Sequence, residues 1–243
     1  MTARQLALAA EVPASTVSRI ENGTVSPSAD MVERLIGAAG FAVDARLVPV
    51  AHPAAVRTAR AVLEGSAYPY PADTAWLSRW RRTGLLREGD RPRSVAELLY
   101  AAGAASRLTG RAGATTWRAP TPSADEVIDA AVARLSPRGC VVTGGAAANR
   151  LVSSADARWV VLYADITPQI AAELGWEPSE GAIARGETFV TVMDPMPEYV
   201  AGAWSDDGVR RWAEPIQVVI DCYAGSGRMP DQADRLLAAI GLM

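Results

Sequence analysis

The first 41 residues show helical periodicity broken at short intervals, which limits this stretch to several short helices joined by tight turns. Pro13 suits the first turn of a second helix, and Asn22-Gly23 ends that helix, because glycine reaches positive φ without steric cost. Ser26 or Ser28 caps a third helix. The residues expected to face inward are Leu6, Ala9, Ala10, Val17, Ile20, Met31, Val32, Leu35 and Ile36.

This spacing predicts a helix-turn-helix, in which the second of two short helices lies in the major groove of DNA. Ala7 is the small residue needed where the helices cross, and Val12 is the apolar residue needed after the turn. Among the outward side chains of the second helix, Arg19 can make a bidentate contact to guanine, which discriminates by ~1–3 kcal/mol. The residues predicted to face bases are Ala14, Ser15, Ser18 and Arg19.

The strings VPASTVSRIENG and SPSADMVERLIGAAGF resemble the Cro/C1 (Xre) family of repressors over some 40 residues. The resemblance implies an all-α, lambda-repressor-like unit that binds a double-stranded DNA operator and regulates transcription as a repressor. A homodimer is expected from geometry, because one recognition helix reads only a few base pairs and half-sites lie ~34 Å apart. Carried over by position, it places Ala14, Ser15 and Arg19 at the bases. It places Ala3, Thr16 and Asn22 at the phosphates.

The chain departs from this family at two points. Glu11 occupies the turn position that the family usually gives to glycine, which costs up to ~1 kcal/mol where positive φ is needed. The family also carries a further helix before this segment. We therefore expect either that the native start lies upstream of Met1, or that the helix of residues 53–63 or a second subunit covers the exposed apolar face.

Charge and composition divide the rest of the chain. Residues 1–56 carry a net charge of −1, residues 57–118 carry +6 and residues 119–243 carry −8. We expect a helix-turn-helix domain at residues 1–50, a basic helical middle region at 51–118 and an α/β domain at 119–243. A strand or extended arm is expected at residues 41–47, and the loop of residues 109–123 forms the second boundary. The fold class is α+β.

The basic middle region is expected to form helices at residues 53–63, 73–83 and 94–108. In the second of these, Arg79, Arg81 and Arg82 are predicted to contact DNA phosphates that the near-neutral first segment leaves unmatched. The alternative is that this helix is structural, with its arginines forming a solvated face. Its expected core residues are Trp76, Leu77 and Trp80.

Helices and apolar strands alternate from residue 124 onward. Helices are predicted at 124–135, 145–153, 168–174 and 229–240, and strands at 139–143, 158–164, 188–193 and 216–222. Cys140 and Cys222 are interpreted as buried, reduced thiols on two of these strands.

Gly144-Gly145 lies between a predicted strand and helix, in the string CVVTGGAAANRL, and such a turn can approach phosphates. This resembles nucleotidyltransferases, which bind a triphosphate there and hold Mg²⁺ with an Asp-x-Asp pair on the next strand. Here Arg158 stands two residues after Asp156, and Asp165 stands alone, so the pair is broken. We expect a degenerate nucleotidyltransferase-like domain without catalytic residues, metal or cofactor. The alternative is a nucleotide-using transferase with an attached DNA-binding module.

The string EPIQVVIDCYAGSGRMPDQADRLLAAIG, together with TGGAAANRL, resembles AbiEi-type antitoxins of the type IV toxin–antitoxin class over residues 139–243. The resemblance implies autoregulation of an operon and a cognate toxin protein as a partner, so an antitoxin acting mainly by protein–protein contact is a further alternative. The family's motif residues here are Asp221, Gly225, Gly227, Arg228 and Pro230. A strand–turn–helix explains the same residues structurally.

Two classes of protein are excluded by composition. No apolar run approaches the ~18 residues of a membrane span, and no basic stretch followed by an apolar one marks an export signal. With one histidine and no Cys-x-x-Cys pair, a structural zinc site is not expected. The sequence therefore predicts a cytoplasmic protein.

Overall fold

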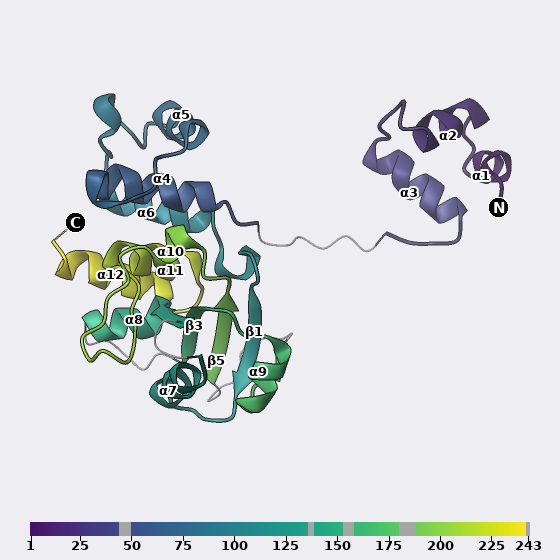
Figure 1. Ribbon diagram of the computed structural model, residues 1–243. Coiled ribbons are helices and arrows are strands. Elements are labelled where there is room, and N and C mark those ends of the chain that lie inside the picture. Colours follow the sequence, from purple (N-terminus) through teal and green to yellow (C-terminus); the bar gives the residue numbers. More distant parts are fainter. Residues whose placement is uncertain (44–49, 136–138, 153–157, 180–187, 242–243) are drawn as a thin grey trace. The chain divides into compact units, whose positions relative to one another are not determined.

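The computed structural model describes residues 1–43, 50–135, 139–152, 158–179 and 188–241. Two units follow one another along the chain, Met1–Val48 and Pro49–Met243 (Figure 1). Residues 44–47 of the expected arm lie outside the described ranges. No helix among the described residues is long and apolar enough to cross a membrane.

The first unit consists of three short helices, α1 (Ala3–Ala9), α2 (Ala14–Glu21) and α3 (Ala29–Ala38). The Thr2 hydroxyl caps α1 by accepting a hydrogen bond from the backbone N–H of Gln5, and the side-chain oxygen of Gln5 accepts one from the backbone N–H of Thr2. Ser28 caps α3 by accepting a hydrogen bond from the N–H of Met31 at 3.3 Å. The predicted helices and their breaks are confirmed.

A five-stranded sheet lies at the centre of the second unit, in the order β2-β3-β5-β1-β4. Its strands are β1 (Thr115–Ala119), β2 (Cys140–Thr143), β3 (Trp159–Ala164), β4 (Glu177–Pro178) and β5 (Thr188–Met193). β3 and β5 are parallel, and the other neighbours are antiparallel. The outer edge of β2 is covered, because Val142 exchanges backbone hydrogen bonds with Arg211 and Ala213.

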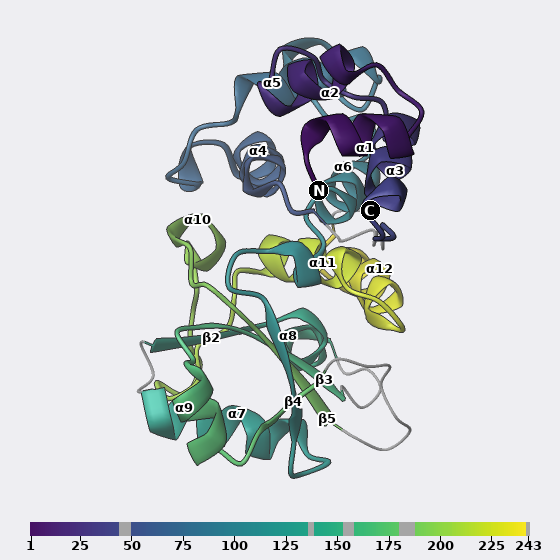
Figure 2. The same cartoon turned by 90° about the vertical axis from the view of Figure 1, so that its right-hand side faces the viewer.

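Helices cover both faces of this sheet, so β2 and β5 are buried along their whole length (Figure 2). α7 lies against one face, with α9 beside it, and α8 lies against the other. α11 and α12 pack on α8, and α4 and α6 form a further layer on α11 (Figure 1). The helices are α4 (Pro53–Glu64), α5 (Thr74–Arg82), α6 (Val95–Ala104), α7 (Ala124–Leu135), α8 (Gly144–Leu151), α9 (Pro168–Glu173), α10 (Pro197–Val200), α11 (Pro215–Ala224) and α12 (Met229–Ala239).

The strand predicted at residues 216–222 is wrong, because this segment is helix α11. Glu214 caps it by accepting hydrogen bonds from the N–H groups of Ile216 and Gln217, and Pro215 occupies its first turn. Every residue from Ile216 to Ala224 is buried, because α11 lies between α6 and α8. A helix buried on all sides lacks a polar face and is as uniformly apolar as a buried strand. Cys222 is therefore buried on a helix, whereas Cys140 is buried on strand β2 as predicted.

The boundary predicted near residue 118 falls inside a strand. Arg118 belongs to β1, which pairs with β5 from Thr115 to Ala119 within the segment expected to be a loop. Its threonines and flanking glycines and prolines obscure the short strand in the sequence. Residues on both sides of Arg118 contribute to one hydrophobic core.

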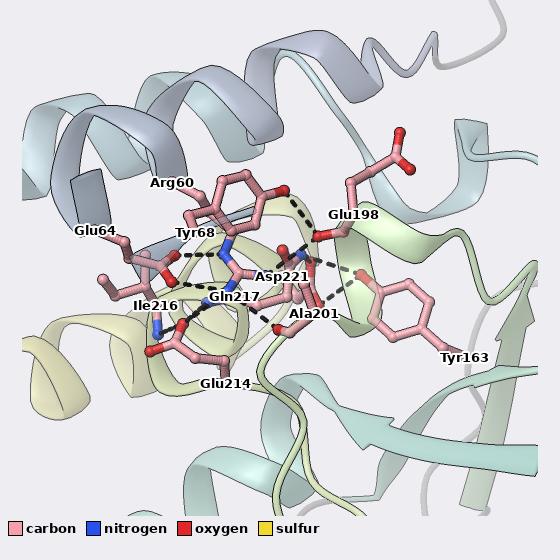
Figure 3. Close-up of polar contacts among 10 residues, drawn as sticks. All are labelled: Arg60, Glu64, Tyr68, Tyr163, Glu198, Ala201, Glu214, Ile216, Gln217 and Asp221. Carbon is pink, nitrogen blue, oxygen red and sulfur yellow. Dashed lines mark hydrogen bonds and ion pairs between the residues drawn. The ribbon is translucent and has the colours of Figure 1, made fainter. Parts of the chain in front are cut away.

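A buried arginine joins α4 to the segment before α11 (Figure 3). The Nε of Arg60 lies 2.6 Å from Oε1 of Glu64, and its Nη1 and Nη2 donate to the carbonyls of Glu198 and Ala201, each at 3.2 Å. The ring of Tyr68 stacks 4.4 Å from the guanidinium, and its hydroxyl donates to the Glu198 carbonyl at 2.9 Å. The basic middle region is thereby held to the rest of the second unit by satisfied polar contacts.

Candidate nucleic-acid interface

A small apolar core orients the helices of the first unit. Ala7, Ala10 and Val17 are at most 3 % exposed, and Ala7 lies on α1, which contacts both α2 and α3. The short side chain of Ala7 permits the close crossing that the sequence predicted. Ile20 and Leu35 are half-buried around this core. Packing on one side of α2 thus fixes the orientation of this helix, and its other side stays exposed to solvent.

The turn between α1 and α2 uses a non-glycine residue in the left-handed region. Glu11 has φ +53°, and its N–H donates to the carbonyl of Leu8 at 3.2 Å. The N–H of Val12 donates to the carbonyl of Ala7 at 2.9 Å, which closes the turn. This position therefore does need a positive φ, the condition under which the sequence predicted a cost. Without a glycine there, the turn carries a strain of up to about 1 kcal/mol.

The outer face of α2 carries the four residues predicted to face bases. Ala14, Ser15, Ser18 and Arg19 are all exposed, whereas Val17 on the opposite side is 1 % exposed. The Arg19 guanidinium has no side-chain partner within the part of the chain that the structure describes. A guanidinium that is not engaged within the protein can donate two hydrogen bonds to O6 and N7 of guanine.

The residues predicted to face phosphates lie at the ends of these helices. Ala3 begins α1 and Thr16 lies in the first turn of α2, and both are half-buried. Asn22 follows the last residue of α2, and its amide donates a weak hydrogen bond to the Ser18 hydroxyl at 3.4 Å. Asn22 and Ser18 are therefore neighbours, and their contacts with DNA stay a prediction.

The three arginines of α5 differ in their contacts. Arg81 forms a two-pronged ion pair with Asp90, with Nε–Oδ1 at 2.6 Å and Nη2–Oδ2 at 2.7 Å, and this pair lowers the pKa of Asp90. Arg79 lies over the Trp76 ring at 5.1 Å and keeps its hydrogen-bond donors available. Arg82 is exposed and has no side-chain partner among the described residues. Arg79 and Arg82 are thus better placed than Arg81 to meet phosphates.

The inner face of α5 is structural, as the alternative interpretation predicted. Trp80 is 3 % exposed, and Trp76 and Leu77 are half-buried against the core. The outer face carries the arginines, so both interpretations apply to different sides of one helix.

Two further exposed arginines were not singled out as candidate site residues from the sequence. Arg87 and Arg91 lie on the hairpin after α5, where the N–H of Arg87 donates to the carbonyl of Arg91 at 2.8 Å. Both side chains are exposed and have no partner in the described ranges. The string LREGDRPR, with Gly-Asp at its centre, is the signal that could have placed both on one hairpin.

The Gly144-Gly145 turn does not present an open surface to a phosphate. Gly144 has φ +61°, and a Cβ atom there would lie 2.8 Å from Cε of Met229 and 2.9 Å from Cγ2 of Val161. Both glycines are buried, so packing accounts for the small residue at Gly144. Asp156 lies outside the described residues, and Asp165 is exposed after β3. Among the described residues, no group of three His, Cys, Asp or Glu side chains could hold a metal ion.

Four of the five motif residues of the last segment have structural roles, whereas Arg228 is exposed and has no acidic partner among the described residues. Asp221 on α11 accepts hydrogen bonds from the Tyr163 hydroxyl and the Gln217 amide, each at 2.8 Å (Figure 3). Gly225 ends α11, Gly227 adopts φ +65°, and Pro230 lies in the first turn of α12. The turn and helix-start chemistry is confirmed, although on a helix–turn–helix connection in place of the predicted strand–turn–helix.

Comparison with known families gives one match. Residues 1–47 match the family described as "Helix-turn-helix domain". Comparisons with curated proteins and with solved structures gave no match. The first unit is therefore a helix-turn-helix domain, a kind of domain typical of DNA-binding regulators.

Proposed function

We propose that this protein is a sequence-specific DNA-binding transcriptional regulator that reads its operator with α2 and represses transcription as a homodimer. The observation that carries the proposal is the outer face of α2, where the free guanidinium of Arg19 stands among small exposed residues. The opposite side of α2 is anchored through Val17. A helix held in this way presents one side to base edges while its packing fixes its direction.

The two units contribute differently to the proposed DNA binding. The first 56 residues carry a net charge of −1, so their net charge does not attract a polyanion. Specific binding nevertheless rests largely on phosphate contacts. The exposed arginines of the second unit supply these contacts in our proposal, with Arg79 and Arg82 on α5 as the leading pair. Sequence reading then belongs to the first unit and much of the affinity to the second.

The homodimer follows from the small reach of one recognition helix. A single helix reads only a few base pairs, and two half-sites lie ~34 Å apart on one face of the duplex. The predicted complex therefore contains two protomers on a nearly palindromic operator. Light scattering on the complex with a single operator duplex tests this, and one protomer per duplex would contradict it.

The proposal is tested with the full chain and a labelled duplex taken from the region upstream of its own gene. Fluorescence anisotropy at fixed ionic strength should show binding to this duplex at least ~10³-fold tighter than to a shuffled duplex of the same composition. The shuffled duplex reports the nonspecific electrostatic term alone. Equal affinity for the two duplexes would contradict autoregulation by sequence-specific binding.

A narrower form of the proposal makes the protein an autoregulatory antitoxin. It rests on the resemblance of residues 139–243 and predicts that the product of the adjacent gene binds the full chain. Co-expression of the two products and purification through a tag on this chain tests it. Failure to recover the second product would remove the toxin partner and leave DNA binding unaffected.

We further propose that the second unit does not transfer nucleotides. The packing of Gly144 against Met229 and Val161 supports this, because a phosphate has no open backbone to approach at that turn. Incubation with labelled nucleotide and Mg²⁺ or Mn²⁺ should leave RNA and protein unlabelled. Transfer that is lost in Asp165→Asn would contradict it and favour the transferase alternative.

A further inference from the structure

A pocket of about 550 Å³ opens in the second unit between the start of α7, the end of α8 and Arg158, which directly precedes β3. Its apolar lining comes from Ile128, Ala146 and Trp212, and three arginines from separate segments also line it. This volume falls in the range of pockets that hold small organic ligands. The pocket plays no part in the proposed contacts with DNA.

The three arginines of the pocket differ in how their charge is compensated. Arg210 is held between Asp125 at 2.6 Å and Asp129 at 2.8 Å. Arg150 pairs with Asp206 through one nitrogen, and its side chain remains 52 % exposed. Both charges are thus compensated within the protein.

Arg158 is the exception. It is exposed, and its guanidinium has no partner among the described residues. A guanidinium has five N–H donors in a planar fork, which matches two oxygens of one anionic group. Within the described residues, the pocket therefore presents a cation without a counter-charge beside apolar side chains.

We propose that this pocket binds a small organic anion, with Arg158 contacting its acidic group and the apolar side chains covering its body. A single free guanidinium matches one negative charge better than the several charges of a triphosphate. The apolar lining by Ile128, Ala146 and Trp212 distinguishes this class of ligand from inorganic ions. The site lies within one unit, so its test needs no DNA and can fail independently of the proposed function.

The test uses the full chain and 8-anilino-1-naphthalenesulfonate, whose fluorescence rises when its apolar body leaves water. We expect saturable binding below about 1 mM, weakened about tenfold in Arg158→Gln, since a charge-assisted hydrogen bond is lost. Arg82→Gln is the matched control, because it also removes an exposed, unpaired arginine of the second unit, on α5. It should change the affinity less than twofold.

A neutral probe separates the charge from the apolar contact. N-phenyl-1-naphthylamine has the same rings without the sulfonate and should bind at least about tenfold more weakly. Competition by benzoate and by inorganic phosphate distinguishes a carboxylate ligand from a phosphate ligand. Absence of saturable binding, equal effects of Arg158→Gln and Arg82→Gln, or equal affinity for the neutral probe would overturn the proposal.

Discussion

The guanidinium of Arg111 and the carboxylate of Asp221 form a fully buried ion pair across 110 residues of sequence, with Nη1 2.7 Å from Oδ1. Thr143, Tyr163 and Gln217 also donate hydrogen bonds to this carboxylate, and the Tyr199 ring lies 4.8 Å from the guanidinium. Burial by itself would lower the pKa of Arg111, but the charge of Asp221 raises it above its usual value. The pair fixes α11 against the chain segment that follows α6.

Replacing Asp221 by Asn should lower the free energy of unfolding by ~3–5 kcal/mol, because it leaves the buried Arg111 cation without its counter-charge. Denaturant unfolding of the second unit measures this loss. The double variant Arg111→Met/Asp221→Asn should lose clearly less than the sum of the two single variants, since it removes both charges. Additive losses would show that the two charges do not stabilise one another.

The two cysteines should be unreactive in the folded protein. Burial raises the pKa of Cys140 to about 12 and that of Cys222 well above its usual value, so little thiolate forms at neutral pH. Ellman's reagent at pH 8 should modify neither thiol until denaturant is added. Fast modification of the native protein would contradict this.

Stability should also fall as the pH rises above about 8.5. There the thiols of the unfolded chain release protons that the folded chain keeps, so the pH rise favours unfolding. Burial raises the pKa of Tyr163 and Tyr199 as well, which extends the loss to higher pH. Melting temperatures measured from pH 7 to pH 10 check the sign. A rise in melting temperature over this range would contradict it.

Replacing Glu11 by Gly should stabilise the first unit by roughly 0.5–1 kcal/mol, because it relieves the strain of positive φ at a non-glycine residue. Glu21→Gly is the control, since it places glycine at the last residue of α2 and should destabilise by up to about 1 kcal/mol. Native-state hydrogen exchange of α1 and α2 measures both changes. Destabilisation by Glu11→Gly would mean that the Glu11 side chain stabilises the first unit by more free energy than the strain of its positive φ costs.

Much of the fold could be predicted from periodicity and caps. The helix predicted at residues 124–135 begins and ends as predicted, and the strand predicted at 188–193 does so too. Both patterns show a clear face or a clean apolar run bounded by turn residues. α11 was misassigned, because a helix buried on every side carries no polar stripe that would reveal its period. β1 was missed, because its pairing with β5 is tertiary and leaves little local trace.

The candidate interface was predictable where packing and exposure follow the helical period. Val17 faces inward and Arg19 outward because they are two positions apart on one helix. The contact of Arg81 with Asp90 was not predictable, because it depends on how the hairpin after α5 turns back. The pocket beside α7 also escaped prediction, since its arginines come from three segments that only the tertiary fold brings together.

Replacing Arg79 and Arg82 by Gln should weaken binding to operator and shuffled DNA alike, because phosphate contacts carry no sequence information. The slope of log affinity against log salt should flatten by ~1 for each lost contact. Arg81→Gln is the control and should flatten the slope less, since Arg81 is already engaged by Asp90. An unchanged slope in the double variant would place these arginines away from DNA.

In the proposed complex, Arg19 reads a base from the outer face of α2. Arg19→Ala should weaken binding to the upstream duplex by ~1–3 kcal/mol at fixed ionic strength, and should leave binding to the shuffled duplex nearly unchanged. Arg34→Ala removes the same charge from the same unit, where Arg34 pairs with Asp30 at 3.1 Å, and should change the two affinities equally. The decisive measurement is the ratio of the two affinities in each variant. We expect this ratio to fall in Arg19→Ala and to stay unchanged in Arg34→Ala, and an unchanged ratio in Arg19→Ala would show that Arg19 does not read a base.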